Sequence, residues 1–212
     1  KLIDFYGIQK LYGLIIARNK EAVEETIKEI TRKLIFGGAN SKHEVIEVFC
    51  LIRFVIASVI ADTELEIDDF SVIEFREDES IDVLFKSLCK DALTVMESLE
   101  SKKRNANREL RERIMKYIEN NFADPDIYAD SIAEKFNISR NYVYNLVREE
   151  TGKSLNDYIE HLRMKRAIDL LKSTNMLVSD ISAECGYNST NTFYKVFKKV
   201  FNVSPSTFRS GL

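Results

Sequence analysis

Residues 130–149 read "DSIAEKFNISRNYVYNLVRE", and this stretch decides the fold of the second half of the chain. A short helical segment contains the small residue Ala133, a turn follows at Asn137, and a longer helical segment comes next. That longer segment has apolar anchors at Val143, Leu146 and Val147. Asparagine tolerates the left-handed backbone that a tight turn needs. The spacing therefore predicts two helices that cross closely, the helix-turn-helix pattern.

Residues 179–199, "SDISAECGYNSTNTFYKVFKK", repeat this arrangement. Ser182 takes the place of the small residue and Gly186 that of the turn residue, and the anchors are Phe193, Val196 and Phe197. One such match is a weak signal, because any two helices with a tight turn imitate it. Two in tandem are much stronger. We interpret Phe193 and Phe197 as core rather than as platforms for stacking bases, because their spacing matches that of the anchors.

The segment between the two copies, residues 155–173, predicts one long helix with two apolar stripes. The first stripe is Leu155, Tyr158, Ile159 and Leu162, and the second is Met164, Ala167, Ile168 and Leu171. At about 100° per residue the stripes lie roughly opposite each other, so one helix serves two small cores. Its length of about 28 Å is suited to holding two recognition helices roughly one DNA turn, about 34 Å, apart.

Helix signals divide the rest of the second half clearly. Helices are expected at 108–121, 129–136, 140–150, 155–173, 180–185, 189–201 and 205–210. Gly152 is placed to end one helix and Ser154 to cap the next. Ser204 before Pro205 is an N-cap followed by proline at the first helical position.

The first half also predicts helices, because residues 1–124 contain no proline and few glycines. One apolar face at Val23, Ile27, Ile30 and Leu34 is followed by a stop at Gly37-Gly38, and Ser41 with Glu44 resembles a capping box. We expect four or five helices in 1–100. The acidic segment 63–79 fits a short helix or a loop, and 100–109 fits an exposed hinge or a continuous helix.

The fold class is therefore all-α. We expect a helical bundle for signal relay or dimerisation over 1–100, a linker over 101–108 and a seven-helix DNA-binding domain over 109–212. The apolar run 45–61 is interrupted by Glu47 and Arg53, which favours a buried helix over a membrane span. We expect no membrane contact from this part of the protein. Since the chain starts at Lys1 rather than methionine, we expect a piece of a longer protein.

Charge differs between the halves of a chain whose net charge is −3. Residues 1–100 hold 12 Lys and Arg against 20 Asp and Glu, a net charge of −8, and residues 101–212 hold 19 against 14, a net charge of +5. A basic half predicts a polyanionic partner. The cysteines at 50, 89 and 185 show no metal-ligand spacing, which favours reduced, buried thiols in the cytoplasm.

The second half resembles the DNA-binding domain of AraC/XylS-type transcription regulators. The matching pieces are "SIAEKFNIS", "EETGKSLNDYIEHLRMKRAIDLLKST" and "VSDISAECGYNSTNTFYKVFKKVFNVSPSTFR". The tail "SPSTFR" is similar to the family's Ser-Pro-x-x-Tyr-Arg, with Phe208 in place of tyrosine. The resemblance implies a double helix-turn-helix that binds double-stranded promoter DNA as a monomer and recruits or positions RNA polymerase.

The resemblance also implies which residues contact DNA. Bases would be read by Arg140, Asn141, Tyr144 and Asn145 in the first motif and by Thr190, Asn191, Thr192 and Lys195 in the second. Asn145 stands where the family often has arginine, so the base preference of that half-site is open. Phosphates would be held by Ser139, Arg148, Lys153, Lys198, Lys199 and Ser204. Each lysine alone also fits a solvated surface charge.

The first half does not resemble the family's β-barrel sugar sensor. It resembles the helical segment that precedes this domain in longer bacterial regulators carrying an upstream receiver or membrane sensor, as response regulators do. A homodimer through 1–100, or repulsion of DNA by its negative charge, is a hypothesis. Two alternatives are a helical signalling adaptor and a small-molecule sensor with an apolar site near Tyr12, Phe49 and Phe54, residues that core packing explains better.

An enzyme is not expected. His43 and His161 lack cysteine or carboxylate neighbours at metal-ligand spacing, and we find no phosphate-binding loop or nucleophile motif. The paired acids near 68 and 77 fit a solvated face. We therefore predict no catalytic residues, no metal and no cofactor.

Overall fold

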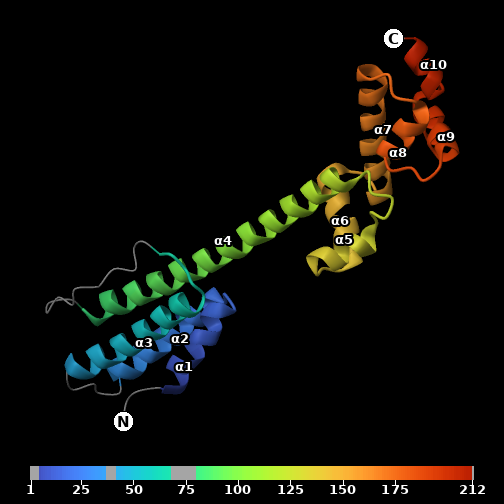
Figure 1. Cartoon of the computed structure of the whole chain (residues 1–212). Helices are drawn as coiled ribbons and strands as arrows, with labels where there is room; N and C mark the ends of the chain where they lie inside the picture. The colour runs from blue at the N-terminus through green and yellow to red at the C-terminus, as the bar shows by residue number, and fades with distance from the viewer. Residues whose placement is uncertain (1–4, 37–41, 68–79, 212) are drawn as a thin grey trace. The chain divides into compact units, whose positions relative to one another are not determined.

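The computed structural model describes residues 5–36, 42–67 and 80–211. All regular secondary structure in these ranges is helical, which confirms the predicted all-α class. The chain divides into two units, residues 1–106 and 107–212, and α4 (Ile81–Asn121) passes through the division (Figure 1). Each unit has apolar cores of its own.

Four helical segments build the core of the first unit. They are α1 (Phe5–Ile16), α2 (Lys20–Phe36), α3 (Lys42–Asp62) and the first turns of α4. The predicted stripe on α2 is buried, and it packs with apolar side chains of the other three helices, among them Leu11, Ile52, Ile56, Leu88 and Val95. The Arg53 guanidinium lies 3.2 Å from the Asp91 carboxylate and ties α3 to α4.

Two sequence expectations for the first unit are wrong. Cys50 is exposed rather than buried, and Phe54 has 71% of its surface exposed, whereas Phe49 lies in the core. Phe54 and Cys50 lie one turn apart on the outward side of α3, while Phe49 lies on its inward side. An apolar site enclosed by Tyr12, Phe49 and Phe54 is therefore not formed, and the Tyr12 hydroxyl instead donates a hydrogen bond to Asp62 Oδ2 (2.8 Å).

Some expectations fall wholly or partly outside the described residues. These are the stop at Gly37-Gly38, the capping box at Ser41 and the acidic stretch 68–79. The described start of the ambiguous segment, 63–67, is turn and non-helical chain. In the described ranges we find no helix with both the length and the apolar character that a membrane span requires.

Residues 101–108 are helical, as part of α4. This stretch lacks glycine and proline, and two lysines, two arginines and Ala106, all good helix formers, make up most of it. All of its side chains are exposed. Local propensity, rather than burial, therefore accounts for the helix here.

The second unit contains the end of α4 and six shorter helices. These are α5 (Ala129–Phe136), α6 (Arg140–Thr151), α7 (Leu155–Ser173), α8 (Val178–Glu184), α9 (Thr190–Phe201) and α10 (Pro205–Ser210). Ser154 and Ser204 cap α7 and α10 as predicted, and Gly152 ends α6 with a left-handed backbone (φ 71°). Helix α8 begins two residues before the predicted start, at Val178.

Helix α7 contributes to two separate cores, as its two stripes predict. Leu155 and Ile159 are buried with the end of α4, α5 and α6. Met164, Ala167 and Leu171 are buried with α8 and α9. Phe208 on α10 packs against this second core, with its ring centroid 5.7 Å from that of Phe197.

Candidate nucleic-acid interface

The first motif consists of α5, a turn and α6. Asn137 takes the left-handed conformation in the turn (φ 51°), and Ala133 is 93% buried where the two helices pack, as its exposed fraction of 7% shows. The anchors Val143, Leu146 and Val147 are buried. Ser139 Oγ accepts a hydrogen bond from the Tyr142 backbone N–H (3.1 Å) and caps α6. The sequence prediction of this motif is confirmed.

The opposite face of α6 is polar and open to solvent. Its exposed side chains include the four expected base readers, Arg140, Asn141, Tyr144 and Asn145. The phosphate candidates Ser139, Arg148 and Lys153 are also exposed. Arg140 Nε lies 3.1 Å from Asp130 Oδ1 at the start of α5, so an acid already orients this arginine. This ion pair could not be predicted from the sequence, because it depends on the geometry of the turn.

The second motif consists of α8, a turn and α9. Gly186 takes the left-handed conformation (φ 82°), and Ser182 and Cys185 are buried. Phe193 and Phe197 are fully buried, with ring centroids 5.7 Å apart, so both aromatics are core as predicted.

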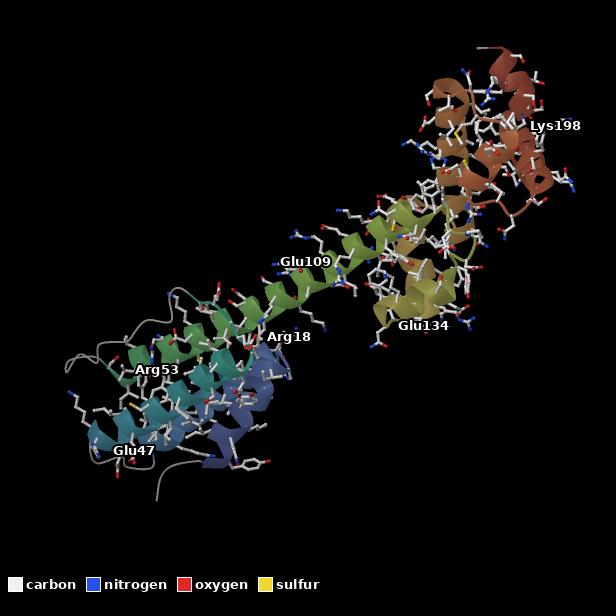
Figure 2. The ribbon with its side chains drawn as sticks, in the orientation of Figure 1. Arg18, Glu47, Arg53, Glu109, Glu134 and Lys198 are labelled. Atoms are coloured by element: carbon white, nitrogen blue, oxygen red, sulfur yellow. The ribbon has the colours of Figure 1, made fainter. Side chains whose placement is uncertain are left out.

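The outer face of α9 carries the second set of candidates. Asn191, Thr192 and Lys195 are exposed, and Thr190 is partly exposed. Lys198 and Lys199 are exposed towards the end of the helix, where Figure 2 labels Lys198. Ser204 is half-buried and caps α10, which begins at Pro205. Unlike Ser139, Ser189 makes no side-chain hydrogen bond to the start of its helix.

Two acidic side chains beside the first motif pair with Arg111 on α4. Its Nη1 donates to Glu149 Oε2 (2.9 Å) and its Nη2 to Glu150 Oε1 (2.7 Å). Both hydrogen bonds raise the pKa of Arg111, and the one to Glu150 has the larger effect. The Tyr142 hydroxyl donates to Asn107 Oδ1 (2.9 Å), a second link from α6 to α4. The single positive charge of Arg111 offsets one of the two negative charges. This halves the repulsion that Glu149 and Glu150 would exert on a polyanion near Arg148 and Lys153.

Two tyrosines, Tyr158 in α7 and Tyr187 in the turn after α8, have raised pKa values. Burial raises the pKa of Tyr158 to about 12, and the hydrogen bond that its hydroxyl donates to Glu119 adds to this. Burial also raises the pKa of Tyr187 to about 12, with Glu160 adding and Arg163 opposing. A tyrosine with an ordinary pKa of about 10 is already neutral near pH 7, so these shifts leave the charge of the site unchanged there. The described residues hold no group of three or more metal-ligating side chains.

Comparison with known proteins finds relatives of the second unit. Residues 132–211 match a family model described as "Helix-turn-helix domain". The Msm operon regulatory protein of Streptococcus mutans is 40% identical over 80 residues, 38% of this chain and 29% of that protein. The HTH-type transcriptional activator RhaS of Escherichia coli O139:H28 is 32% identical over 98 residues, 46% of this chain and 35% of that protein.

Residues 132–211 of the second unit thus match a helix-turn-helix domain, and the similar curated proteins are a regulatory protein and a transcriptional activator. A solved structure similar to the second unit is the C-terminal domain of AraT, a response regulator from Geobacillus stearothermophilus. It has 31% sequence identity and a TM-score of 0.47, and the match covers 49% of this chain and 85% of that one. The chain spans about a third of the length of the curated relatives named above.

Proposed function

We propose that this chain is a sequence-specific DNA-binding transcription regulator that reads two successive major-groove segments. The observation that carries the proposal is the pair of helix-turn-helix motifs in one unit. In each motif, one face of the second helix is buried by apolar anchors and the other presents polar side chains without any acid at the predicted reading positions. Such a helix fits the major groove with its outer face against the base edges.

The base readers proposed for α6 are Arg140, Asn141, Tyr144 and Asn145, and those for α9 are Thr190, Asn191, Thr192 and Lys195. Amide and hydroxyl groups and cationic side chains supply the donors and acceptors that distinguish base pairs in the major groove. Their exposure on the two helices supports this assignment.

The phosphate contacts proposed are Ser139, Arg148, Lys153, Lys198, Lys199 and Ser204. Cationic side chains and the N-termini of helices attract phosphate without regard to sequence. We therefore assign affinity and its salt dependence to this set, and sequence preference to the base readers.

The test is fluorescence anisotropy on duplexes selected from a random pool, at several salt concentrations. Wild type is expected to select a site with two half-sites about one turn apart. A Thr190→Ala, Asn191→Ala double variant should lose its preference in one half-site only. Lys198→Ala should weaken binding to all sequences alike and reduce the dependence of log K on log salt by about one unit.

A matched control is Lys172→Ala, which removes an exposed lysine near the end of α7, outside both recognition helices. It should leave both the sequence preference and the salt dependence at wild-type values. A wild-type protein that binds no duplex in a salt-dependent way would remove the basis of the proposal.

For the first unit we propose a role in relaying a signal or in homodimerisation. The supporting features are its separate apolar core and its helix α4, which continues into the second unit. We further propose that the protein acts in the cytoplasm as part of a response regulator and that it recruits or positions RNA polymerase at promoter DNA. AraT, whose C-terminal domain is similar to the second unit, is itself a response regulator.

A further inference from the structure

The turn of the second motif lies against the loop between α4 and α5. A Cβ atom added at Gly186 would lie 2.4 Å from the carbonyl oxygen of Ala123, too close for any side chain. Phe122, the residue before Ala123, packs against the core of the first motif. This contact therefore joins the two motifs directly, in addition to the helix α7 that they share.

Arg163 on α7 reaches the same junction. Its Nε donates to the Phe122 carbonyl oxygen (2.8 Å) and its Nη2 to the Asp124 carbonyl oxygen (2.9 Å). Its guanidinium carbon lies 5.3 Å from the centroid of the Tyr187 ring, in the turn region of the second motif. The planar guanidinium can make both hydrogen bonds and still cover an aromatic face.

We propose that Arg163, with the contact between Gly186 and Ala123, is a brace that fixes α6 relative to α9 and so determines the spacing of DNA half-sites that the protein accepts. The inference rests on the DNA-reading function proposed above. Two small bodies joined only by one helix can rock about it, whereas a second point of contact away from the helix axis removes this freedom. Arg163 is a positioning residue, because it acts through the two recognition helices.

The consequence for DNA is geometric. One inserted base pair moves the second half-site by about 3.4 Å along the axis and rotates it by about 34°. A rigid pair of recognition helices follows that change only if the DNA deforms, and deformation opposes binding. A loosened pair follows it more easily. The brace thus predicts a high affinity ratio between the selected site and sites with altered spacing.

The experiment measures Kd for the selected duplex and for duplexes with one base pair inserted or removed between the half-sites. The spacing penalty is the ratio of the second Kd to the first. For wild type we expect at least about a tenfold penalty, comparable with one mismatched base pair. Arg163→Met, which keeps the apolar stem and loses both hydrogen bonds, should reduce the penalty several-fold. Arg163→Lys should be intermediate, because its ammonium keeps the charge near Tyr187 but lacks the fork.

Arg166→Met is the matched control, since it removes an exposed arginine from the same helix with the same substitution. A ratio of affinities cancels any uniform loss of phosphate attraction, so Arg166→Met should keep the wild-type penalty. An equal fall in both methionine variants would assign the effect to lost charge on α7 and overturn the brace.

Thermal unfolding tests whether each variant is folded at the assay temperature. If Arg163→Met is unfolded there, the spacing penalty of Arg163→Lys tests the inference instead. A folded Arg163 variant with the wild-type penalty would overturn the inference while leaving the DNA-reading function intact. A wild type without sequence preference would instead refute the proposed function itself, so the two failures are distinguishable.

Discussion

At the scale of single residues, two glycines with similar backbone conformations have different surroundings. Gly152 (φ 71°) ends α6, and a Cβ atom there would meet no atom within 4 Å. Gly186 (φ 82°) has the backbone of Ala123 where its Cβ would be. The first position needs glycine for its conformation only, and the second needs it for conformation and for space.

Alanine substitutions should separate these two requirements. Gly152→Ala should lower the free energy of unfolding by about 1 kcal/mol, the cost of a left-handed L-residue. Gly186→Ala should lower it by about 3 kcal/mol, because overpacking against backbone adds to that cost. Urea unfolding followed by circular dichroism measures both. Equal losses would mean that the loop at Ala123 yields without cost, contrary to the close contact described above.

At the scale of helices, the two recognition helices begin differently. Ser139 caps α6 through the Tyr142 N–H, whereas the Ser189 side chain makes no cap hydrogen bond at α9. The two serines occupy matching places, but only the Ser139 side chain stabilises the start of its helix by a cap hydrogen bond.

Ser139→Ala should therefore destabilise the second unit by about 1 kcal/mol, the usual cost of losing a cap hydrogen bond. Ser189→Ala should change the unfolding free energy by only a few tenths of that value, since no such bond is lost. Chemical denaturation of the two variants in parallel provides the measurement, and each is the control of the other. A larger loss in Ser189→Ala would contradict the hydrogen bonding described at these helix starts.

How well the helices could be predicted depended on how local their signals are. Ser154, Gly152 and the Ser204-Pro205 pair mark helix ends through contacts within a few residues. The predicted ends of those helices therefore lie close to the ends in the structure. Helix α8 starts after Leu177, which offers no capping side chain, and its start was misplaced. A repeated pattern located both turns, since a left-handed residue is required in each.

The contacts that position the candidate site could not be predicted in the same way. Arg163 is separated by 41 residues from its partner Phe122, and Arg111 by 39 from Glu150. Their polar side chains look like ordinary solvated charges in the sequence. Phe54 shows the reverse limit, because an aromatic residue in an apolar helix predicts burial, and only the packing of α3 leaves it exposed.

At the scale of the whole molecule, the two halves of the chain carry opposite net charges. Residues 1–100 carry a net charge of −8 and residues 101–212 one of +5. Electrostatic repulsion between an acidic segment and DNA is strong at low ionic strength and is screened beyond about 10 Å at 0.1 M salt. Residues 1–100 are thus expected to lower the affinity of the full chain.

A fragment of residues 101–212 should accordingly bind the selected duplex more tightly than the full chain at low salt, and the difference should shrink as salt is added. Anisotropy across a salt series measures the affinities, and analytical ultracentrifugation measures the oligomeric state of both proteins. If the affinity and the oligomeric state were both unchanged, neither repulsion nor dimerisation could be assigned to the first unit.

Helix α7 also has a consequence for how the second unit opens. Leu155 and Ile159 on one side and Met164, Ala167 and Leu171 on the other belong to different cores. Detaching or melting this helix would expose both cores to water at once. Neither motif can therefore unfold by losing α7 without also destabilising the other motif. Amide hydrogens in the buried parts of α6 and α9 should then exchange with solvent through one shared opening event, as members of a single cooperative folding unit.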